Sequence, residues 1–196
     1  MILETAKKVI ESEINALYDL LETINDNLEQ AAVLIQQSKG RVVVTGVGKS
    51  GHIGRKIAAT LASTGTPAFF VHATEAAHGD LGMITADDVV IAISYSGRTE
   101  ETLNVVPSIR QIGAKLIALT GRPDSPLAQN ADVTLDIGVR EEADPLGLAP
   151  TNSTTATLAL GDALAIALSV DRGFTREDFG KFHPGGSLGR QLRGET

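Results

Sequence analysis

The sequence predicts one three-layer α/β domain: a doubly wound, five-stranded parallel sheet between helices, preceded by a helical N-terminal segment. Short β-branched and aliphatic runs alternate along the chain with segments of helical periodicity. These runs are continuous rather than alternating in polarity, as expected for strands that are covered on both faces. Aromatic residues make up only 4% of the 196 residues, so the core is mainly aliphatic, which favours helices packed on a parallel sheet.

The N-terminal segment, residues 2–38, has the periodicity of a helix. Its apolar side chains recur at steps of three and four residues, at Ile2, Leu3, Ala6, Val9, Ile10, Ile14, Leu17, Leu20, Leu21 and Ile24. An apolar stripe of this length needs a partner surface. Two partners are open from the sequence: the sheet of the same chain, or a second subunit.

Five strands are expected in the sheet, each a short apolar run. They are residues 41–45, 68–71, 89–94, 116–120 and 133–137. Helices are expected between or after them, at residues 53–62, 100–112, 154–170 and 175–179. No linker or repeat interrupts the pattern, so residues 1–196 are interpreted as a single domain.

Composition narrows the functional class. The formal net charge is −7, which argues against a nucleic-acid-binding protein. The chain has no cysteine, so disulfides and thiolate metal sites are excluded. No signal peptide is expected, and no segment is expected to approach the length of a membrane span. We therefore expect a cytoplasmic protein with no membrane partner.

A glycine-rich loop at residues 46–51 (GVGKSG) separates the first expected strand from a helix. Backbone N–H groups at such a helix start attract anions, and Lys49 adds a positive charge. The P-loop motif requires a glycine at position 43, where this chain has Val43. The dinucleotide fingerprint matches formally, but its acidic ribose ligand is poorly matched, because Glu75 lies beyond the second strand.

A second loop, residues 94–99 (SYSGRT), also joins a strand to a helix. The hydroxyl groups of Ser94, Ser96 and Thr99 and the backbone at Gly97 can cradle a phosphate without a metal. One such turn is equally typical of an ordinary helix cap. Two such loops at the carboxyl ends of strands in one sheet predict a small phosphorylated metabolite, with its phosphate at one loop and its reacting end at the other.

The pattern S-x-S-G-x-T after a strand resembles the hallmark of sugar isomerase (SIS) domains, which implies a flavodoxin-like fold. Other segments resemble the arabinose 5-phosphate isomerase branch: residues 46–54 (GVGKSGHIG), 77–82 (AHGDLG), 145–151 (PLGLAPT), 153–156 (STTA) and 183–186 (HPGG). The resemblance covers nearly the whole chain. It implies an enzyme that interconverts D-ribulose 5-phosphate and D-arabinose 5-phosphate through an enediolate, feeding the synthesis of Kdo for lipopolysaccharide or capsule.

The same resemblance implies four catalytic positions, Lys49, Glu101, Glu142 and His183. Lys49 would stabilise negative charge on the enediolate. Glu142 is favoured over Glu101 as the base, with Glu101 shaping the charge around Lys49, although the two roles are interchangeable on sequence alone. His183 suits proton transfer or ring opening near neutral pH, and one hypothesis places it in the site of a neighbouring subunit.

The remaining site residues are expected to bind substrate: Gly48, Ser50, Gly51, His78, Ser94, Ser96, Gly97 and Thr99. No cofactor is expected to be required. His72 and His78 suggest a zinc site, but further ligands at a recognised spacing are missing. We therefore expect that any zinc that binds at His72 is an inhibitor and not a functional metal. The resemblance also implies a homo-oligomer, with a tetramer favoured.

Two other functions stay open from the sequence: a non-catalytic SIS module that senses a phosphosugar, and an NAD-dependent enzyme. The set of acid–base residues favours the enzyme over the sensor. Many SIS relatives of this branch continue into a pair of CBS regulatory modules. This chain stops at Thr196, so we expect the SIS domain alone, without CBS modules.

Overall fold

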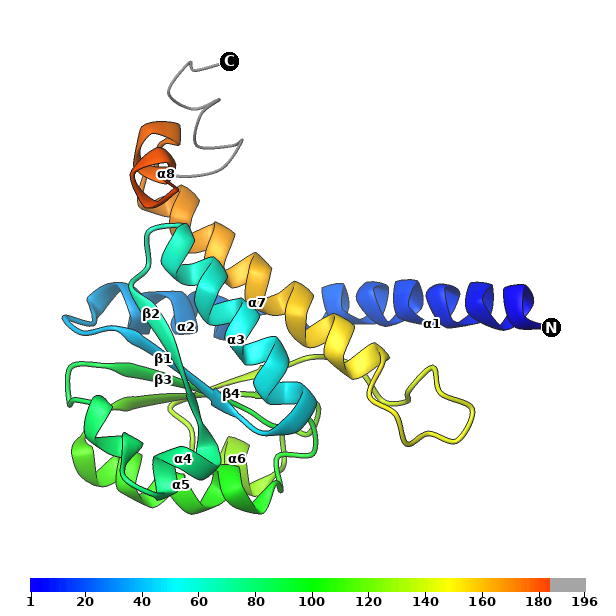
Figure 1. Cartoon of the computed structure of the whole chain (residues 1–196), viewed down its shortest axis with the longest axis horizontal. Helices are drawn as coiled ribbons and strands as arrows, with labels where there is room; N and C mark the ends of the chain where they lie inside the picture. Colours follow the sequence, from blue (N-terminus) through cyan, green and yellow to red (C-terminus); the bar gives the residue numbers. More distant parts are fainter. Residues whose placement is uncertain (184–196) are drawn as a thin grey trace.

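The computed structural model describes residues 1–183 and has the three-layer α/β architecture that the sequence predicts (Figure 1). Its five strands are all parallel, in the order β2-β1-β3-β4-β5. The strands are β1 Val42–Gly46, β2 Ala68–His72, β3 Val89–Ile93, β4 Lys115–Thr120 and β5 Val133–Asp136. Because the chain leaves β1 to one side for β2 and to the other for β3, the strand order reverses at β1. Ligands of such sheets bind at this reversal, beyond the carboxyl ends of the strands.

Burial explains why the strands were predictable. Every residue of β1 and β3 is buried, and β4 is buried except for Lys115, so these strands are continuous apolar runs. The edge strands β2 and β5 are only partly buried. All five strands begin and end within one residue of their predicted bounds.

Helices cover both faces of the sheet. One face carries α1 Ile2–Thr23, α2 Asp26–Gln37, α3 Gly48–Ser63 and α7 Asn152–Asp171. The other face carries α4 Ala73–Ala77, α5 Glu100–Ile112 and α6 Pro126–Gln129. A short 3₁₀ helix, η1 Asp80–Met83, follows α4, and α8 Arg176–Phe182 follows α7. Alternate residues of each central strand supply the two cores, so Val42 and Val44 face one layer while Val43 faces the other.

The N-terminal segment is two helices, which corrects the expectation of a continuous helical run. The backbone of Ile24 is extended, with φ −67° and ψ 120°, and ends α1. The side chain of Asn25 then accepts a hydrogen bond from Asn27 N at 2.9 Å and caps α2. Asparagine is favoured at this capping position, so the polar run Asn25-Asp26-Asn27 was the sequence signal for this boundary.

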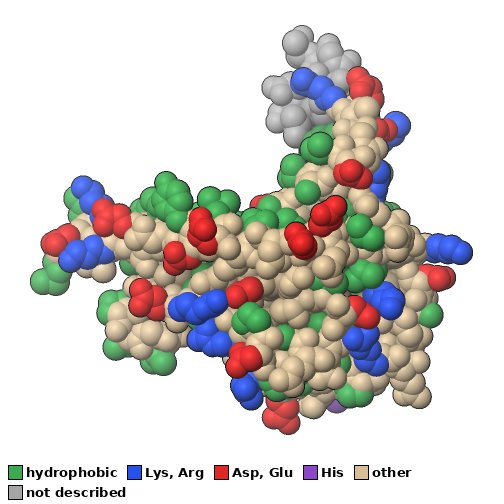
Figure 2. All heavy atoms as spheres, turned by 180° about the vertical axis from the view of Figure 1, so that it is seen from behind, with side chains coloured by type: hydrophobic (Ala, Val, Ile, Leu, Met, Phe, Trp, Pro, Cys, Tyr) green, Lys and Arg blue, Asp and Glu red, His purple; other side chains and the backbone are tan. Residues whose placement is uncertain are grey.

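Helix α1 projects from the body as an arm, in blue in Figure 1. Of its residues only Ala16 and Leu20 are buried, where the arm packs on α7. Most of the predicted stripe is exposed, including Ile2, Ile10 and Leu21, at 88%, 57% and 62%. Figure 2 shows hydrophobic side chains along this arm. Packing on its own domain therefore accounts for only part of the stripe.

Helix α7 is long and apolar enough, by length and composition, to cross a membrane, with a mean hydropathy of 1.4 over 18 residues. This corrects the expectation that no segment approaches such a length. Half of that window is buried inside the domain. Leu160, Leu164 and Leu168 lie in the core shared with α3 and the sheet. Within residues 1–183, the apolar residues of α7 are thus explained by its packing in the core on one face of the sheet.

Candidate active site

The two predicted loops begin at paired residues of neighbouring strands. Gly46, the last residue of β1, is the register partner of Ile93, the last residue of β3. A Cβ atom on residue 46 would lie 3.1 Å from the carbonyl oxygen of Ile93, so the backbones approach closely at this point. Loop 46–51 and loop 94–99 therefore leave the carboxyl edge of the sheet side by side.

The first loop runs directly into the first turn of α3. Gly48 has a positive φ of 57° and begins the helix, so Lys49 and Ser50 lie in its first turn. N–H groups in a first helical turn have no partner within the helix, and they present partial positive charge. The Lys49 side chain is exposed, and within the described part of the chain it forms no ion pair. Gly48 has open space beside it, whereas Gly51 is buried, and a Cβ atom on it would lie 3.1 Å from the carbonyl oxygen of Gly46.

The second loop is a tight turn closed by hydroxyl groups. Ser94 is buried, and its Oγ lies 2.8 Å from Oγ1 of Thr99. Gly97 N donates to Ser94 O at 3.0 Å, and Arg98 N donates to Ser96 Oγ at 3.2 Å. Thr99 precedes the first residue of α5, but its side chain accepts no hydrogen bond from that helix. The first N–H groups of α5 thus donate no hydrogen bond to the Thr99 side chain, which leaves them available to a ligand.

Ser125, which caps α6, packs against Gly97 of this loop. Ser125 was not identified from the sequence. Gly97 has a φ of 61°, and a Cβ atom on it would overlap the buried Ser125 hydroxyl. Leu127 N donates to Gly97 O at 3.2 Å, which fixes the loop to α6. The signal that could have found Ser125 is the Ser-Pro pair, because serine caps a helix whose first residue is proline.

Glu101 and Glu142 have very different surroundings. Glu101 is exposed in the first turn of α5. Glu142 is half-buried and turns back onto the start of α7. Its Oε2 accepts hydrogen bonds from Thr151 N at 2.8 Å, Thr151 Oγ1 at 3.2 Å and Ser153 N at 3.1 Å. A carboxylate in this position is stabilised by the helix dipole and held in one orientation.

The charged loop after β5 also contains Glu141 and Asp144, which the sequence alone could not separate from Glu142. Asp144 Oδ2 accepts hydrogen bonds from Ala149 N at 2.9 Å and Leu148 N at 3.0 Å. These bonds lower the pKa of Asp144 and use its carboxylate to shape its own loop. Glu141 is exposed. Glu142 is therefore the carboxylate of this loop that is fixed against a helix start.

Close packing of α3 on α7 places Lys49 and Glu142 at the same end of the two helices. Lys49 lies in the first turn of α3, and Glu142 is bonded to the first turn of α7. Gly161 of α7 lies against Ile57 of α3, where a Cβ atom on residue 161 would overlap the isoleucine side chain. The helices run in the same direction, because Arg172 after α7 donates to Gly65 O and to Thr66 Oγ1 after α3. The first residue of each helix lies nine residues before the Ile57–Gly161 contact. Both helix starts therefore face the carboxyl edge of the sheet.

His183 lies at the other end of α7. It caps α8, its ring stacks on Phe179 with centroids 3.9 Å apart, and its Nδ1 lies 2.9 Å from Phe179 O. Phe174, which leads into α8, packs against Gly65 beyond the far end of α3. The 20-residue α7 is about 30 Å long. Within one chain the structure therefore does not bring His183 to Lys49 and Glu142.

Two other histidines, His72 and His78, were predicted as site residues. His72 ends β2 beside Gly46, and its Nδ1 accepts a hydrogen bond from Thr74 N at 3.3 Å. His78 follows α4 and is exposed. In residues 1–183 no three His, Cys, Asp or Glu side chains form a cluster that could hold a metal ion. The expectation of inhibitory zinc at His72 thus finds no preformed set of three protein ligands in this part of the chain.

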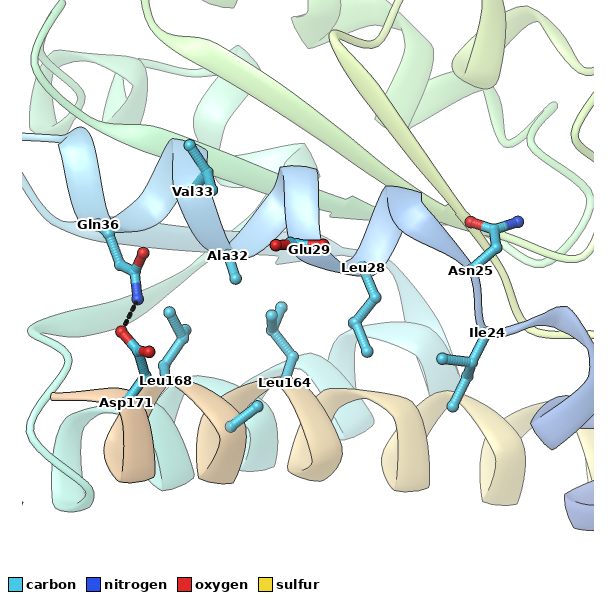
Figure 3. Close-up of a pocket in the computed structure, with 11 residues that line it drawn as sticks. Ile24, Asn25, Leu28, Glu29, Ala32, Val33, Gln36, Leu164, Leu168 and Asp171 are labelled. Atoms are coloured by element: carbon cyan, nitrogen blue, oxygen red, sulfur yellow. Dashed lines mark hydrogen bonds between the residues drawn. The ribbon is translucent and has the colours of Figure 1, made fainter. Parts of the chain in front are cut away.

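A groove of about 380 Å³ between α2 and α7 holds none of the predicted site residues (Figure 3). Leu28, Leu164 and Leu168 line it, and Gln36 Nε2 donates to Asp171 Oδ2 at 2.6 Å at one end. Its lining is mainly aliphatic and carries carboxylates rather than cations, so it is poorly suited to a phosphate. We therefore locate the candidate site at the sheet edge and not in this groove.

Comparisons with known proteins show which family the chain belongs to. The SIS domain family model matches residues 34–167. The arabinose 5-phosphate isomerase KdsD of Pseudomonas aeruginosa is 59% identical over 190 residues, 97% of this chain and 58% of the relative. KdsD of Escherichia coli K12 is 57% identical over 189 residues, 96% of this chain and 58% of the relative. The chain thus spans 58% of the length of these relatives.

A solved structure is similar over nearly its whole length. It is that of a protein of E. coli CFT073 in complex with arabinose 5-phosphate, with a TM-score of 0.91 and 48% sequence identity. The match covers 93% of this chain and 97% of that chain.

Proposed function

This chain belongs to the SIS domain family, and from that premise we propose that it is an isomerase that interconverts D-ribulose 5-phosphate and D-arabinose 5-phosphate. The observation that carries the proposal is the pairing of Gly46 with Ile93, which sets two anion-binding loops side by side. Relatives at 57–59% identity bear the name arabinose 5-phosphate isomerase, and a structurally similar protein binds arabinose 5-phosphate. The family resemblance expected from the loops is thereby confirmed.

In this proposal the second loop holds the phosphate and the first loop attends the reacting carbons. Ser94, Ser96 and Thr99 supply hydroxyl groups at the start of α5, where the helix dipole attracts an anion. Lys49, on the neighbouring helix start, stabilises the negative charge of the enediolate oxygen. A five-carbon sugar phosphate has use for both loops at once, and the remaining predicted contacts at Ser50 and His78 border the same edge.

Glu142 removes the proton, and Glu101 tunes the charge around Lys49. The fixed carboxylate supports this assignment, since a base must be oriented toward one carbon. The same feature favours an enzyme over a phosphosugar sensor, because a sensor requires the cradle but no oriented carboxylate. The reaction proceeds without a cofactor, as this proton transfer needs only acid–base groups and a cation.

His183 acts in the site of a neighbouring subunit of a homo-oligomer, with a tetramer favoured. Its distance from Lys49 in one chain supports a role in trans. The exposed apolar face of α1 supports an interface beside the site, and α1 touches the start of α7 through Ser12 and Asn152. Two exposed leucines of the loop between β5 and α7, Leu146 and Leu148, are further apolar side chains available to such an interface.

The enzyme acts in the cytoplasm, and its product feeds the synthesis of Kdo for lipopolysaccharide or capsule. To test the activity, the pure protein is incubated with ribulose 5-phosphate and the products are identified by NMR. We expect arabinose 5-phosphate from the wild type and little product from Lys49→Ala. Absence of arabinose 5-phosphate, or undiminished turnover in the Lys49→Ala variant, would overturn the proposal.

A further inference from the structure

Glu142 is bound asymmetrically by the start of α7. All three of its hydrogen bonds reach Oε2, from the backbone N–H and the hydroxyl of Thr151 and from Ser153 N. Among residues 1–183, no protein donor is bonded to Oε1. The three bonds therefore anchor Oε2, whereas Oε1 carries no bond from a described protein donor.

The Thr151 hydroxyl is the only one of these three donors that a side-chain substitution can remove. Its Oγ1 also accepts a hydrogen bond from Ala143 N at 2.8 Å, next to Glu142 in the chain. A hydroxyl has a single proton to donate, and with Ala143 N–H occupying one lone pair that proton is directed to Glu142 Oε2. One side chain thus ties both the backbone and the carboxylate of this loop to α7.

The backbone before Glu142 is fixed to the same helical turn. Asn152 Nδ2 donates to Glu141 O at 3.2 Å and to Ser12 Oγ of α1 at 2.8 Å. Asn152 is buried at 3% exposed, so these bonds are shielded from water. With Glu141 O held on one side and Ala143 N on the other, the remaining freedom of Glu142 is in its side chain.

We propose that Thr151 is a positioning residue, whose hydroxyl holds Glu142 Oε2 so that Oε1 faces the substrate; this rests on the proposed isomerase function. In the step concerned the C1–H bond of the ketose breaks and its proton passes to Oε1. The electron pair forms the C1–C2 double bond, and the negative charge passes to the oxygen on C2 beside Lys49. A displacement of the base by about 1 Å lowers such a rate by up to about 100-fold.

The test compares Thr151→Val with Thr151→Ser and a matched control, Thr154→Val, using ribulose 5-phosphate as substrate. Thr154 lies in the same turn, but its hydroxyl donates to Thr151 O at 2.9 Å and does not touch Glu142. For Thr151→Val we expect kcat to fall about 10-fold to 100-fold, with KM changed less than about threefold. Thr151→Ser restores kcat to within about threefold of wild type, and Thr154→Val keeps it there.

The outcomes separate this inference from the activity itself. An active wild type with an equally active Thr151→Val variant overturns the role of Thr151 and leaves the isomerase intact. So does a loss that appears only in KM, or one that Thr151→Ser does not recover. A wild type that does not isomerise ribulose 5-phosphate overturns both. A crystal structure of Thr151→Val in which Glu142 still bonds to Ser153 N in the same orientation also contradicts the positioning role.

Discussion

Gly161 of α7 is packed against Ile57 of α3 with no space for a side-chain atom between them. This contact lets the two helices lie close enough that their first residues, Gly48 and Asn152, face the same edge of the sheet. We expect Gly161→Ala to lower the free energy of unfolding by about 1–3 kcal/mol, because the added methyl group must displace a buried isoleucine. Denaturant unfolding measures this change.

A double-mutant cycle with Ile57→Ala tests the cause. If the methyl group overlaps Ile57, the double variant is more stable than the sum of the two single effects predicts, by about 0.5–3 kcal/mol. Strictly additive effects would show that the cost of Gly161→Ala has another origin.

Gly97 is expected to be irreplaceable in loop 94–99, which we propose holds the phosphate. Alanine there is strained at φ 61° and also overlaps Ser125, so the loop must open. We expect Gly97→Ala to raise KM for ribulose 5-phosphate at least about 10-fold, because the phosphate contacts are lost. Steady-state kinetics measure this directly.

Gly173→Ala is the matched control for backbone strain. Gly173 has a similar φ of 67°, lies in the turn between α7 and α8, and has no atom near the added methyl group. A Gly173→Ala variant that raises KM as much as Gly97→Ala would show that strain alone, and not the shape of the loop, causes the effect.

His183 is expected to complete the site of another subunit. Lys49→Ala and His183→Ala are each expected to be nearly inactive, while a refolded 1:1 mixture of the two is expected to recover about a quarter of wild-type activity. Recovery occurs because some sites combine an intact Lys49 from one chain with an intact His183 from another. A mixture that stays as inactive as its two parents would contradict a shared site.

Asp178 contributes to the acid stability of α8, the helix that His183 caps. Hydrogen bonds from Lys181 and then from Thr175 lower its pKa from 3.8 to about 2 in the folded chain. The contribution of this group to stability is therefore complete above the unfolded pKa of 3.8, and is lost as the pH falls through about 2. Titration of the Asp178 carboxyl carbon by NMR measures the pKa, and a midpoint near 3.8 would refute the capping interaction.

Much of the fold was predictable because burial and periodicity coincide. The central strands are buried throughout, so each is a continuous apolar run, and α5 begins and ends where its periodicity does. The division of the N-terminal segment at Asn25 was missed, because one capping side chain decides it. The short helices α4 and α6 were missed as well, since each has at most five residues and no complete apolar repeat.

The two candidate loops were identifiable from the sequence because each follows a strand, whereas the contacts that depend on the fold were not. Loops 46–51 and 94–99 carry local motifs, but their adjacency depends on the strand order, which places β1 beside β3. Ser125 and Thr151 support site residues 28 and 9 positions away in the chain, at Gly97 and Glu142. No periodicity in the sequence connects such pairs, so only the folded chain reveals them.

The central claim is that an oriented Glu142 transfers a proton between the carbons of a bound sugar phosphate. Deuterium incorporation during isomerisation of ribulose 5-phosphate in D₂O, followed by NMR, tests it most directly. The wild type is expected to form arabinose 5-phosphate that carries deuterium at C2 in those turnovers in which the proton on Glu142 exchanges with solvent before it is returned. Glu142→Gln is expected to lower the rate of incorporation at least about 100-fold with little change in KM, and Glu101→Gln to lower it less. Formation of arabinose 5-phosphate, or incorporation of deuterium, by Glu142→Gln at the wild-type rate would contradict the account.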